Sequence, residues 1–158
     1  MPETAPDPAS PQTAPVVSPV LPCVLAWVLP GLGHLSLGRK GRAVAFFTVV
    51  LATFALGLFS GGTSSLADPQ QPLSYLATFD NLALGPIEIF ARKLSIGGLT
   101  YRLPPDEGDP RRQQLLSRLR ERVRHPTYEY GSTYLLTAGL MNMLLILDAF
   151  DIATGRKS

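Results

Sequence analysis

Cysteine, histidine and charged residues are scarce in this sequence, and each scarcity excludes a class of protein. The chain has one cysteine, Cys23, and two histidines, so neither a disulfide scaffold nor a clustered metal site is expected. Only 16% of the 158 residues are charged and the formal net charge is +2, which argues against nucleic-acid binding. Phosphate-binding glycine loops and G-x-S-x-G nucleophile turns are also missing. We therefore expect no catalytic residue, no metal and no cofactor, and we predict that the protein is not an enzyme.

The distribution of the charges and prolines predicts three regions. Residues 1–19 are rich in proline and alanine, and we expect this tail to be disordered because it has little apolar surface to bury. Its acidic start differs from the basic start of a secretory signal peptide. Residues 20–154 form the expected single helical membrane domain, with a polar, arginine-rich insert at about 101–127. Residues 155–158 are a short basic tail.

The block at 43–62 is the strongest membrane signal in the chain. It contains no charged residue, and its length matches the roughly 20 residues with which a helix crosses about 30 Å of hydrocarbon. At about 100° per residue, small side chains gather on one face of this helix. Such a face suits close helix packing within lipid. The predicted packing residues are Ala45, Thr48, Ala52, Ala55, Gly57 and Gly61.

A second spanning helix is predicted at 132–152. One polar stripe runs along it, and Asn142 points to the opposite side. Polar side chains on a membrane helix should face protein or water rather than lipid. The stripe contains Tyr130, Thr133, Thr137, Asp148 and Asp151.

Two further apolar blocks are interrupted by helix-breaking residues. In the block at 20–37, prolines and glycines predict a helix at about 22–29, a break, and a short helical turn near His34. This block either crosses the membrane or dips in and returns. The block at 73–91 contains two acids, an amide and a proline. It is compatible with a crossing helix, an interfacial helix or a re-entrant one.

The arginine-rich insert contains a predicted amphipathic helix. Asp109 is a helix N-cap and Pro110 suits the first helical position, while the end is expected near Arg124. Two interpretations are equally favoured. The helix lies on an anionic membrane surface, or it is solvated and packs its apolar face on its own protein. That face contains Leu115, Leu116, Leu119 and Val123.

Lysine and arginine next to membrane spans mark the cytoplasmic side. The basic loop at 38–42 is therefore expected in the cytoplasm and the N-terminal tail outside. With three spans, the region 62–131 lies outside and the C-terminus inside. With four spans, the block at 73–91 crosses and the arginine-rich region lies inside, and we favour this arrangement.

The chain offers few residues for chemistry. We interpret His34 as a helix-end residue bonded to backbone or to a carboxylate, with a proton-linked or ligand-binding role as the alternative. The acids near the end of the last helix, Asp148 and Asp151, are expected to pair with the basic residues Arg39, Lys40 or Arg42. The whole predicted structural motif comprises Pro30, Gly31, Gly33, His34, Gly38, Arg39, Gly41, Arg42, Asp148 and Asp151.

Two motifs carry a family resemblance. P-G-L-G-H-L-S-L-G-R-K-G-R at 30–42 and D-A-F-D-I at 148–152 resemble a small bacterial membrane-protein family of unknown function. The first motif is also distantly similar to a two-helix membrane domain with a G-x-H-x-F-Y-L-G linker, from which it departs at 35–37. The closer resemblance covers most of 24–157 and implies an integral membrane protein with no known activity.

The expected fold is all-α: a small helical membrane bundle of three or four membrane segments plus one basic amphipathic surface helix. We expect a multi-pass protein of the cell (inner) membrane that contacts the lipid bilayer, binds no nucleic acid, and acts by helix packing with itself or a membrane partner. One alternative is a small transporter or channel subunit that uses the Asp148 and Asp151 stripe. Another is a membrane enzyme with His34 and Asp148 as an acid–base pair. The expected interface anchors are Trp27, Tyr128 and Tyr130.

Overall fold

The computed structural model describes residues 18–124 and 126–157. Within these residues the chain is helical and contains no strand, which confirms the predicted all-α class. The predicted disordered tail lies outside the described residues except for its last two positions. The helices are α1 (Val20–Val28), α2 (Leu32–Ser36), α3 (Lys40–Phe59), α4 (Pro72–Leu82), α5 (Pro86–Ile96), α6 (Pro110–Val123) and α7 (Tyr128–Ala153).

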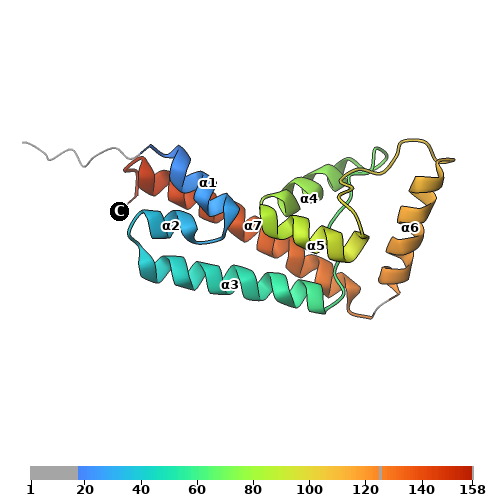
Figure 1. Cartoon of the computed structure of the whole chain (residues 1–158), viewed down its shortest axis with the longest axis horizontal. Helices are drawn as coiled ribbons and strands as arrows, with labels where there is room; N and C mark the ends of the chain where they lie inside the picture. Colours follow the sequence, from blue (N-terminus) through green and yellow to red (C-terminus); the bar gives the residue numbers. More distant parts are fainter. Residues whose placement is uncertain (1–17, 125, 158) are drawn as a thin grey trace, which may run out of the picture.

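Helices α3 and α7 form an antiparallel pair along the long axis of the molecule (Figure 1). Among the described residues, only these two helices are long and apolar enough to cross a membrane. They meet closely at glycines, since a Cβ added to Gly131 would lie 2.4 Å from the backbone nitrogen of Gly62 and 2.8 Å from the carbonyl oxygen of Gly57. The main core contains Val50, Phe54, Leu84, Ala91, Leu135, Ala138 and Leu145.

Helices α1 and α2 form a short hairpin against one end of this pair, as the interrupted block predicted. The break falls at Leu29–Gly31, and Gly31 has a φ of 86°, a conformation that glycine adopts without strain. Gly33 allows the two arms to touch, because a Cβ there would lie 2.4 Å from the carbonyl oxygen of Pro22. The hairpin therefore depends on the glycines of the 30–42 motif.

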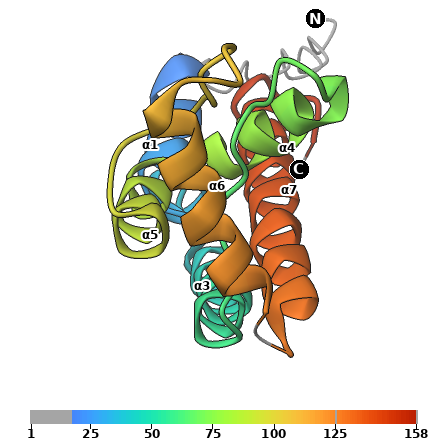
Figure 2. The same cartoon turned by 90° about the vertical axis from the view of Figure 1, so that its right-hand side faces the viewer.

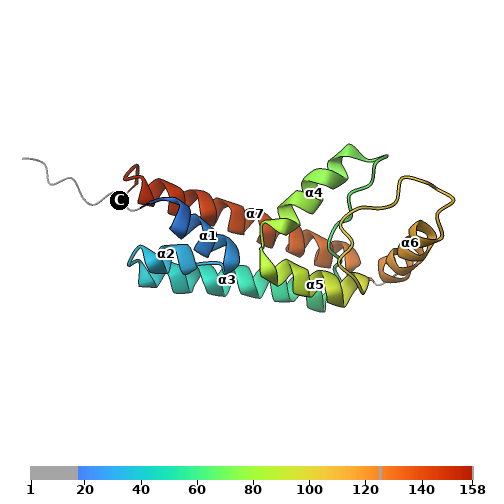
Figure 3. The same cartoon turned by 45° about the horizontal axis from the view of Figure 1, so that its top comes forward.

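The block at 73–91 is not one helix. Helix α4 ends at Leu82, and α5 begins at Pro86 after a turn in which Gly85 has a φ of 65°. Proline suits the first turn of a helix, where its missing N–H has no helical partner to lose. Figure 3 shows α4 and α5 diverging from this turn as a second hairpin.

Helix α6 covers the far end of the molecule, where it stands in front of the other helices in Figure 2. Its N-cap is the predicted one: the Asp109 carboxylate accepts a 2.7 Å hydrogen bond from the backbone N–H of Arg111. Its apolar side chains pack on a second, smaller core. That core contains Leu66, Ile96 and Leu103, and the residues that cover it are Leu115, Leu116 and Leu119.

Two arginines of α6 bind the end of α5. Arg118 donates to the carbonyl oxygen of Ile96 at 2.9 Å, and Arg122 donates to that of Leu94 at 3.2 Å. The last carbonyls of a helix lack partners within the helix and carry its negative dipole end, so guanidinium groups suit this place. Of the two interpretations of α6, packing on its own protein is therefore present. The prediction was wrong for Val123, which is 55% exposed.

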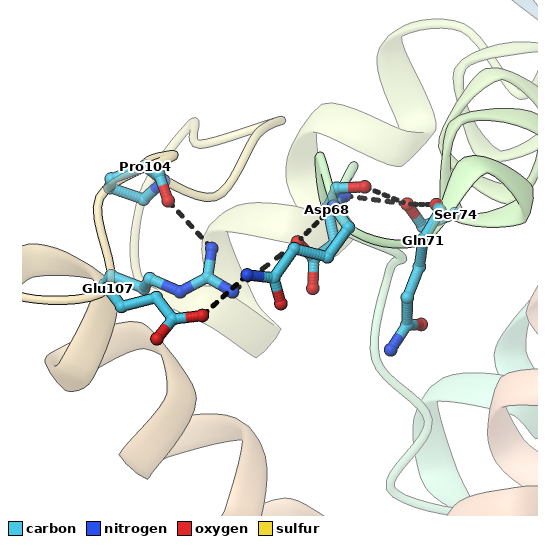
Figure 4. A network of polar contacts seen from close by, with 7 residues as sticks. Asp68, Gln71, Ser74, Pro104 and Glu107 are labelled. Atoms are coloured by element: carbon cyan, nitrogen blue, oxygen red, sulfur yellow. Dashed lines mark hydrogen bonds and ion pairs between the residues drawn. The ribbon is translucent and has the colours of Figure 1, made fainter.

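A polar network ties the loop before α4 to the loop before α6 (Figure 4). Arg112 donates to the carbonyl oxygen of Pro104 at 2.8 Å and lies 3.5 Å from the Asp68 carboxylate. Gln70 donates to Glu107 at 2.6 Å. The arginine-rich insert is thus a folded cap rather than a loose loop.

Candidate functional site

The side chains of His34 and Asp148 meet at the end of the bundle. His34 is completely buried, and its Nε2 lies 2.8 Å from Oδ2 of Asp148. The Phe46 and imidazole rings pack in a T-shaped arrangement, with the ring centroids 5.0 Å apart. This contact joins the short helix α2 to α7 and confirms the interpretation of His34 as a helix-end residue bonded to a carboxylate.

The predicted partners of the two acids were wrong. Asp148 also accepts a 2.5 Å hydrogen bond from Lys157, and Asp151 lies 3.9 Å from Arg156. The reason is local, because the chain turns back directly after α7, and the N–H of Arg156 donates to the carbonyl oxygen of Asp151. The basic tail therefore reaches the acids, and within the described residues Arg39, Lys40 and Arg42 form no ion pair with them.

An open groove of about 540 Å³ lies between α3 and α7 beside these acids. Its charged end contains Arg42, Asp148, Asp151 and Lys157, and the remainder of its lining is apolar. His34 does not line it. The groove therefore reaches the carboxylates without reaching the imidazole.

Asn142 joins the two hairpins at the middle of α7. Its amide nitrogen donates to the carbonyl oxygen of Ala83 at 2.7 Å and to that of Ala26 at 3.3 Å. Both carbonyls lie near the ends of short helices, where intrahelical partners are missing or few. Asn142 is completely buried, opposite the predicted polar stripe, as its helical phase indicated.

Trp27 lies at the same junction. Its indole N–H donates to the carbonyl oxygen of Leu82 at 3.1 Å, and a Cβ on Gly85 would lie 2.0 Å from the Trp27 carbonyl oxygen. The tips of the two hairpins therefore touch. Tyr128 and Tyr130 begin α7, and all three aromatic residues stay predicted interface anchors.

A buried ion pair in α5 was missed by the sequence analysis. Glu88 and Arg92 are 1% and 0% exposed, and their side chains meet at 2.6 Å. Arg92 also donates to the carbonyl oxygens of Thr100 and Ser65, and its guanidinium lies 4.2 Å from the centre of the Tyr101 ring. The available signal was the four-residue spacing of opposite charges, which places both on one helix face.

Tyr101 completes this cluster, with its hydroxyl 3.4 Å from the second Glu88 oxygen. Burial and the neighbouring negative charge of Glu88 raise the pKa of the Tyr101 phenol. The phenol consequently stays protonated at neutral pH and donates to the carboxylate. Glu88, Arg92 and Tyr101 thus find hydrogen-bond partners within the cluster and in two neighbouring loops. We interpret the cluster as a structural connection between α5 and these loops.

The small residues predicted on α3 divide between two environments. Gly57 is buried against Leu135 and Gly131 of α7, and Gly61 follows the helix end with a φ of 78°. By contrast, the face formed by Ala45, Thr48, Ala52 and Ala55, here called the α3 seam, is exposed except at the half-buried Ala55.

The amino-terminal part of the polar stripe on α7 faces outward. Thr133 and Thr137 are exposed and donate to carbonyls of their own helix, at Glu129 and Thr133. Their hydroxyls are thereby satisfied without a partner from another element.

Among the residues that the structure describes, no three His, Cys, Asp or Glu side chains are grouped as metal ligands.

No curated protein and no solved structure matches this chain. One family does match, over residues 21–158, and it is described as a family of unknown function (DUF6677). The match includes the glycine-rich hairpin of α1 and α2, the central Asn142, and the carboxyl end of α7 with its basic tail. The chain belongs to this family of unknown function.

Proposed function

We propose that this protein is a multi-pass membrane protein without enzymatic activity, which acts by packing its α3 seam against a second copy or another membrane protein. The observation that carries the proposal is the outward face of α3. This face is uncharged from Ala43 to Phe59, and Val44, Leu56 and Phe59 are 65%, 53% and 88% exposed. Water disfavours an apolar surface of this extent, whereas lipid or another apolar helix covers it.

The α3 seam supports helix packing within that face. Lipid chains are as apolar as leucine, so helices associate in membranes through close approach of small side chains rather than through hydrophobicity. Ala45, Thr48 and Ala52 are small and exposed, and Thr48 satisfies its hydroxyl on the Val44 carbonyl of its own helix. The seam is therefore free of unmet polar groups.

The proposed arrangement has four membrane segments, of which α3 and α7 cross and the two hairpins do not. It departs from the crossing favoured for 73–91, because α4 and α5 are two short helices joined by a turn. It places the arginine-rich insert outside the cell and Ser18 on the cytoplasmic side. The α1–α2 hairpin enters the membrane from the side on which the carboxyl end of α7 lies, as the contact of Cys23 with Ile146 indicates. The α4–α5 hairpin enters the membrane from the opposite side. Broken helices at membrane depth are tolerated where protein buries the break, and Asn142 and Trp27 bind the carbonyls exposed at these tips.

Cysteine labelling tests this arrangement. In a Cys23→Ser background, S18C, G41C and S117C each place one thiol on an exposed position. With the basic loop 38–42 in the cytoplasm, an impermeant thiol reagent should label S117C on intact cells and label S18C and G41C only after permeabilisation. Labelling of S18C without G41C would mean that the first block crosses, and labelling of all three would contradict a membrane location.

Cross-linking tests the seam. In membranes, A52C should form adducts with a short bifunctional thiol reagent, at twice the chain mass for a second copy or at another mass for a different protein. L140C is the matched control, because Leu140 is 55% exposed on α7 and lies outside the seam. Equal adducts from both variants, or none from A52C, would contradict seam packing.

The acid–base alternative has less support in the geometry. His34 is buried beneath Phe46 and is not part of the groove lining, so a substrate in the groove meets Asp148 but not the imidazole. A general acid–base pair must reach the proton it transfers. We therefore assign the His34–Asp148 contact to holding α2 against α7.

A further inference from the structure

We propose that the groove between α3 and α7 binds one phospholipid, with its phosphate on Arg42 and Lys157 and an acyl chain along the apolar wall. The inference rests on the proposed membrane location and adds a ligand to it. The groove is charged at one end, and its remaining lining contains Phe46, Val50, Met141 and Leu144. A phospholipid has the same division, with one charged head and an apolar tail.

The length of the groove suits one leaflet. Arg42, Phe46 and Val50 lie on successive turns of α3, and at 1.5 Å per residue they span about 12 Å. Half of the hydrocarbon core of a bilayer measures about 15 Å. The groove from Arg42 to Val50 therefore covers most of the depth of one leaflet.

Because both acids at the charged end of the groove already have cationic partners, one cation there, Arg42, is left to bind the phosphate. Asp148 is bound by Lys157 and His34, and Asp151 lies near Arg156. Arg42 is exposed and forms no ion pair within residues 18–124 and 126–157. A guanidinium binds phosphate oxygens through paired N–H groups, and the Lys157 ammonium has two further N–H donors besides the one bound to Asp148.

Retention of phosphatidylglycerol by the purified full-length protein tests the inference. Native mass spectrometry in dodecyl maltoside, a detergent without phosphate, should show one bound lipid per chain. R42Q should retain about tenfold less, as expected for loss of a charge-assisted contact. K40Q is the matched control, because Lys40 is an exposed cation at the same helix start that does not line the groove.

A second pair of variants tests the tail. L144W should fill the apolar part of the groove and reduce retention without changing charge, whereas L140W, one turn away and outside the groove, should retain the lipid. Thermal unfolding of all four variants reports whether each is folded. Added phosphatidylglycerol should raise the midpoint temperature of thermal unfolding of the wild type but not that of R42Q.

Three outcomes would overturn the inference. Equal retention by R42Q and K40Q would mean that basic charge attracts lipid without a site. Competition by glycerol phosphate as strong as by the lipid would indicate a free phosphate site. A dimer that disappears in L144W, with no lipid bound to the wild type, would show that a second copy fills the groove. Cysteine labelling at S18C, G41C and S117C decides membrane location separately, so the two proposals fail independently.

Discussion

The amide nitrogen of Asn142 lies 2.7 Å from the carbonyl oxygen of Ala83, and this contact connects the centre of the longest helix to the tip of the α4–α5 hairpin. The same nitrogen reaches the Ala26 carbonyl of the other hairpin at 3.3 Å. One side chain thus holds two broken helices at the point where their backbones would otherwise lack partners.

Replacing Asn142 by leucine should therefore destabilise the bundle. The substitution leaves buried carbonyls without a donor, at an expected cost of about 1–2 kcal/mol. Thermal unfolding in detergent measures the loss. Leu140→Ala, at an exposed position two residues earlier in the same helix, is the control, and equal midpoints for both variants would contradict the role given to Asn142.

Replacing Asp148 by asparagine should also lower stability, because it removes the charge that both His34 and Lys157 bind. We expect a cost of about 1–2 kcal/mol. Asp151→Asn is the matched control, since Asp151 is more exposed and its pair with Arg156 is longer at 3.9 Å. Unchanged thermal stability of D148N in detergent would rule out the clasp between α2 and α7.

Removing one partner of the buried Glu88–Arg92 pair should be more damaging than removing both. In R92M the Glu88 carboxylate stays buried without its cation, and we expect a loss of about 3–5 kcal/mol. The double variant E88Q/R92M should recover part of that loss, because neither charge remains uncompensated. A double-mutant cycle by chemical denaturation measures the coupling, and additive single effects would argue against a shared network.

Alanine at Gly131 should separate α3 from α7. Its Cβ would lie 2.4 Å from the Gly62 nitrogen, so backbone must shift, at a cost of about 1–3 kcal/mol. Gly41→Ala is the control, because nothing lies within 4 Å of a Cβ at Gly41. Comparable unfolding midpoints for G131A and the wild type would contradict the close crossing of these helices.

The arginines of α6 should differ in their effect on stability. Arg118 donates to the carbonyl of Ile96 at the end of α5, so R118Q should lower stability by about 1–2 kcal/mol. Arg120 is an exposed neighbour, and R120Q should have little effect. If R120Q instead weakened vesicle binding while R118Q left stability unchanged, the membrane-surface interpretation of α6 would be favoured.

Much of the helical structure was predictable because local chemistry decides where helices begin and end. Proline and glycine placed the break between α1 and α2, and Asp109 with Pro110 marked the start of α6. The phase of α7 likewise placed Asn142 opposite the polar stripe. Each of these features depends on residues within a few positions of one another.

The partners of the charged residues were harder to predict, because they depend on which elements the fold brings together. Asp148 binds the tail residue Lys157 and the buried His34 instead of the basic loop before α3. Trp27 donates to the carbonyl oxygen of Leu82 at the end of α4, a partner 55 residues away in the chain. The three arrangements considered for residues 73–91 differ in tertiary contacts and not in local sequence preference.

By itself, then, the sequence determined the helical class, the two long apolar helices and the breaks in the shorter ones, because periodicity, length and backbone restriction act locally. Tertiary structure alone decided that two hairpins meet at Asn142, that Glu88 and Arg92 are buried beside the half-buried Tyr101, and that the α3 seam is left exposed. These outcomes depend on the packing of segments far apart in the chain, where a carbonyl or a charge takes the partner that the fold places within reach.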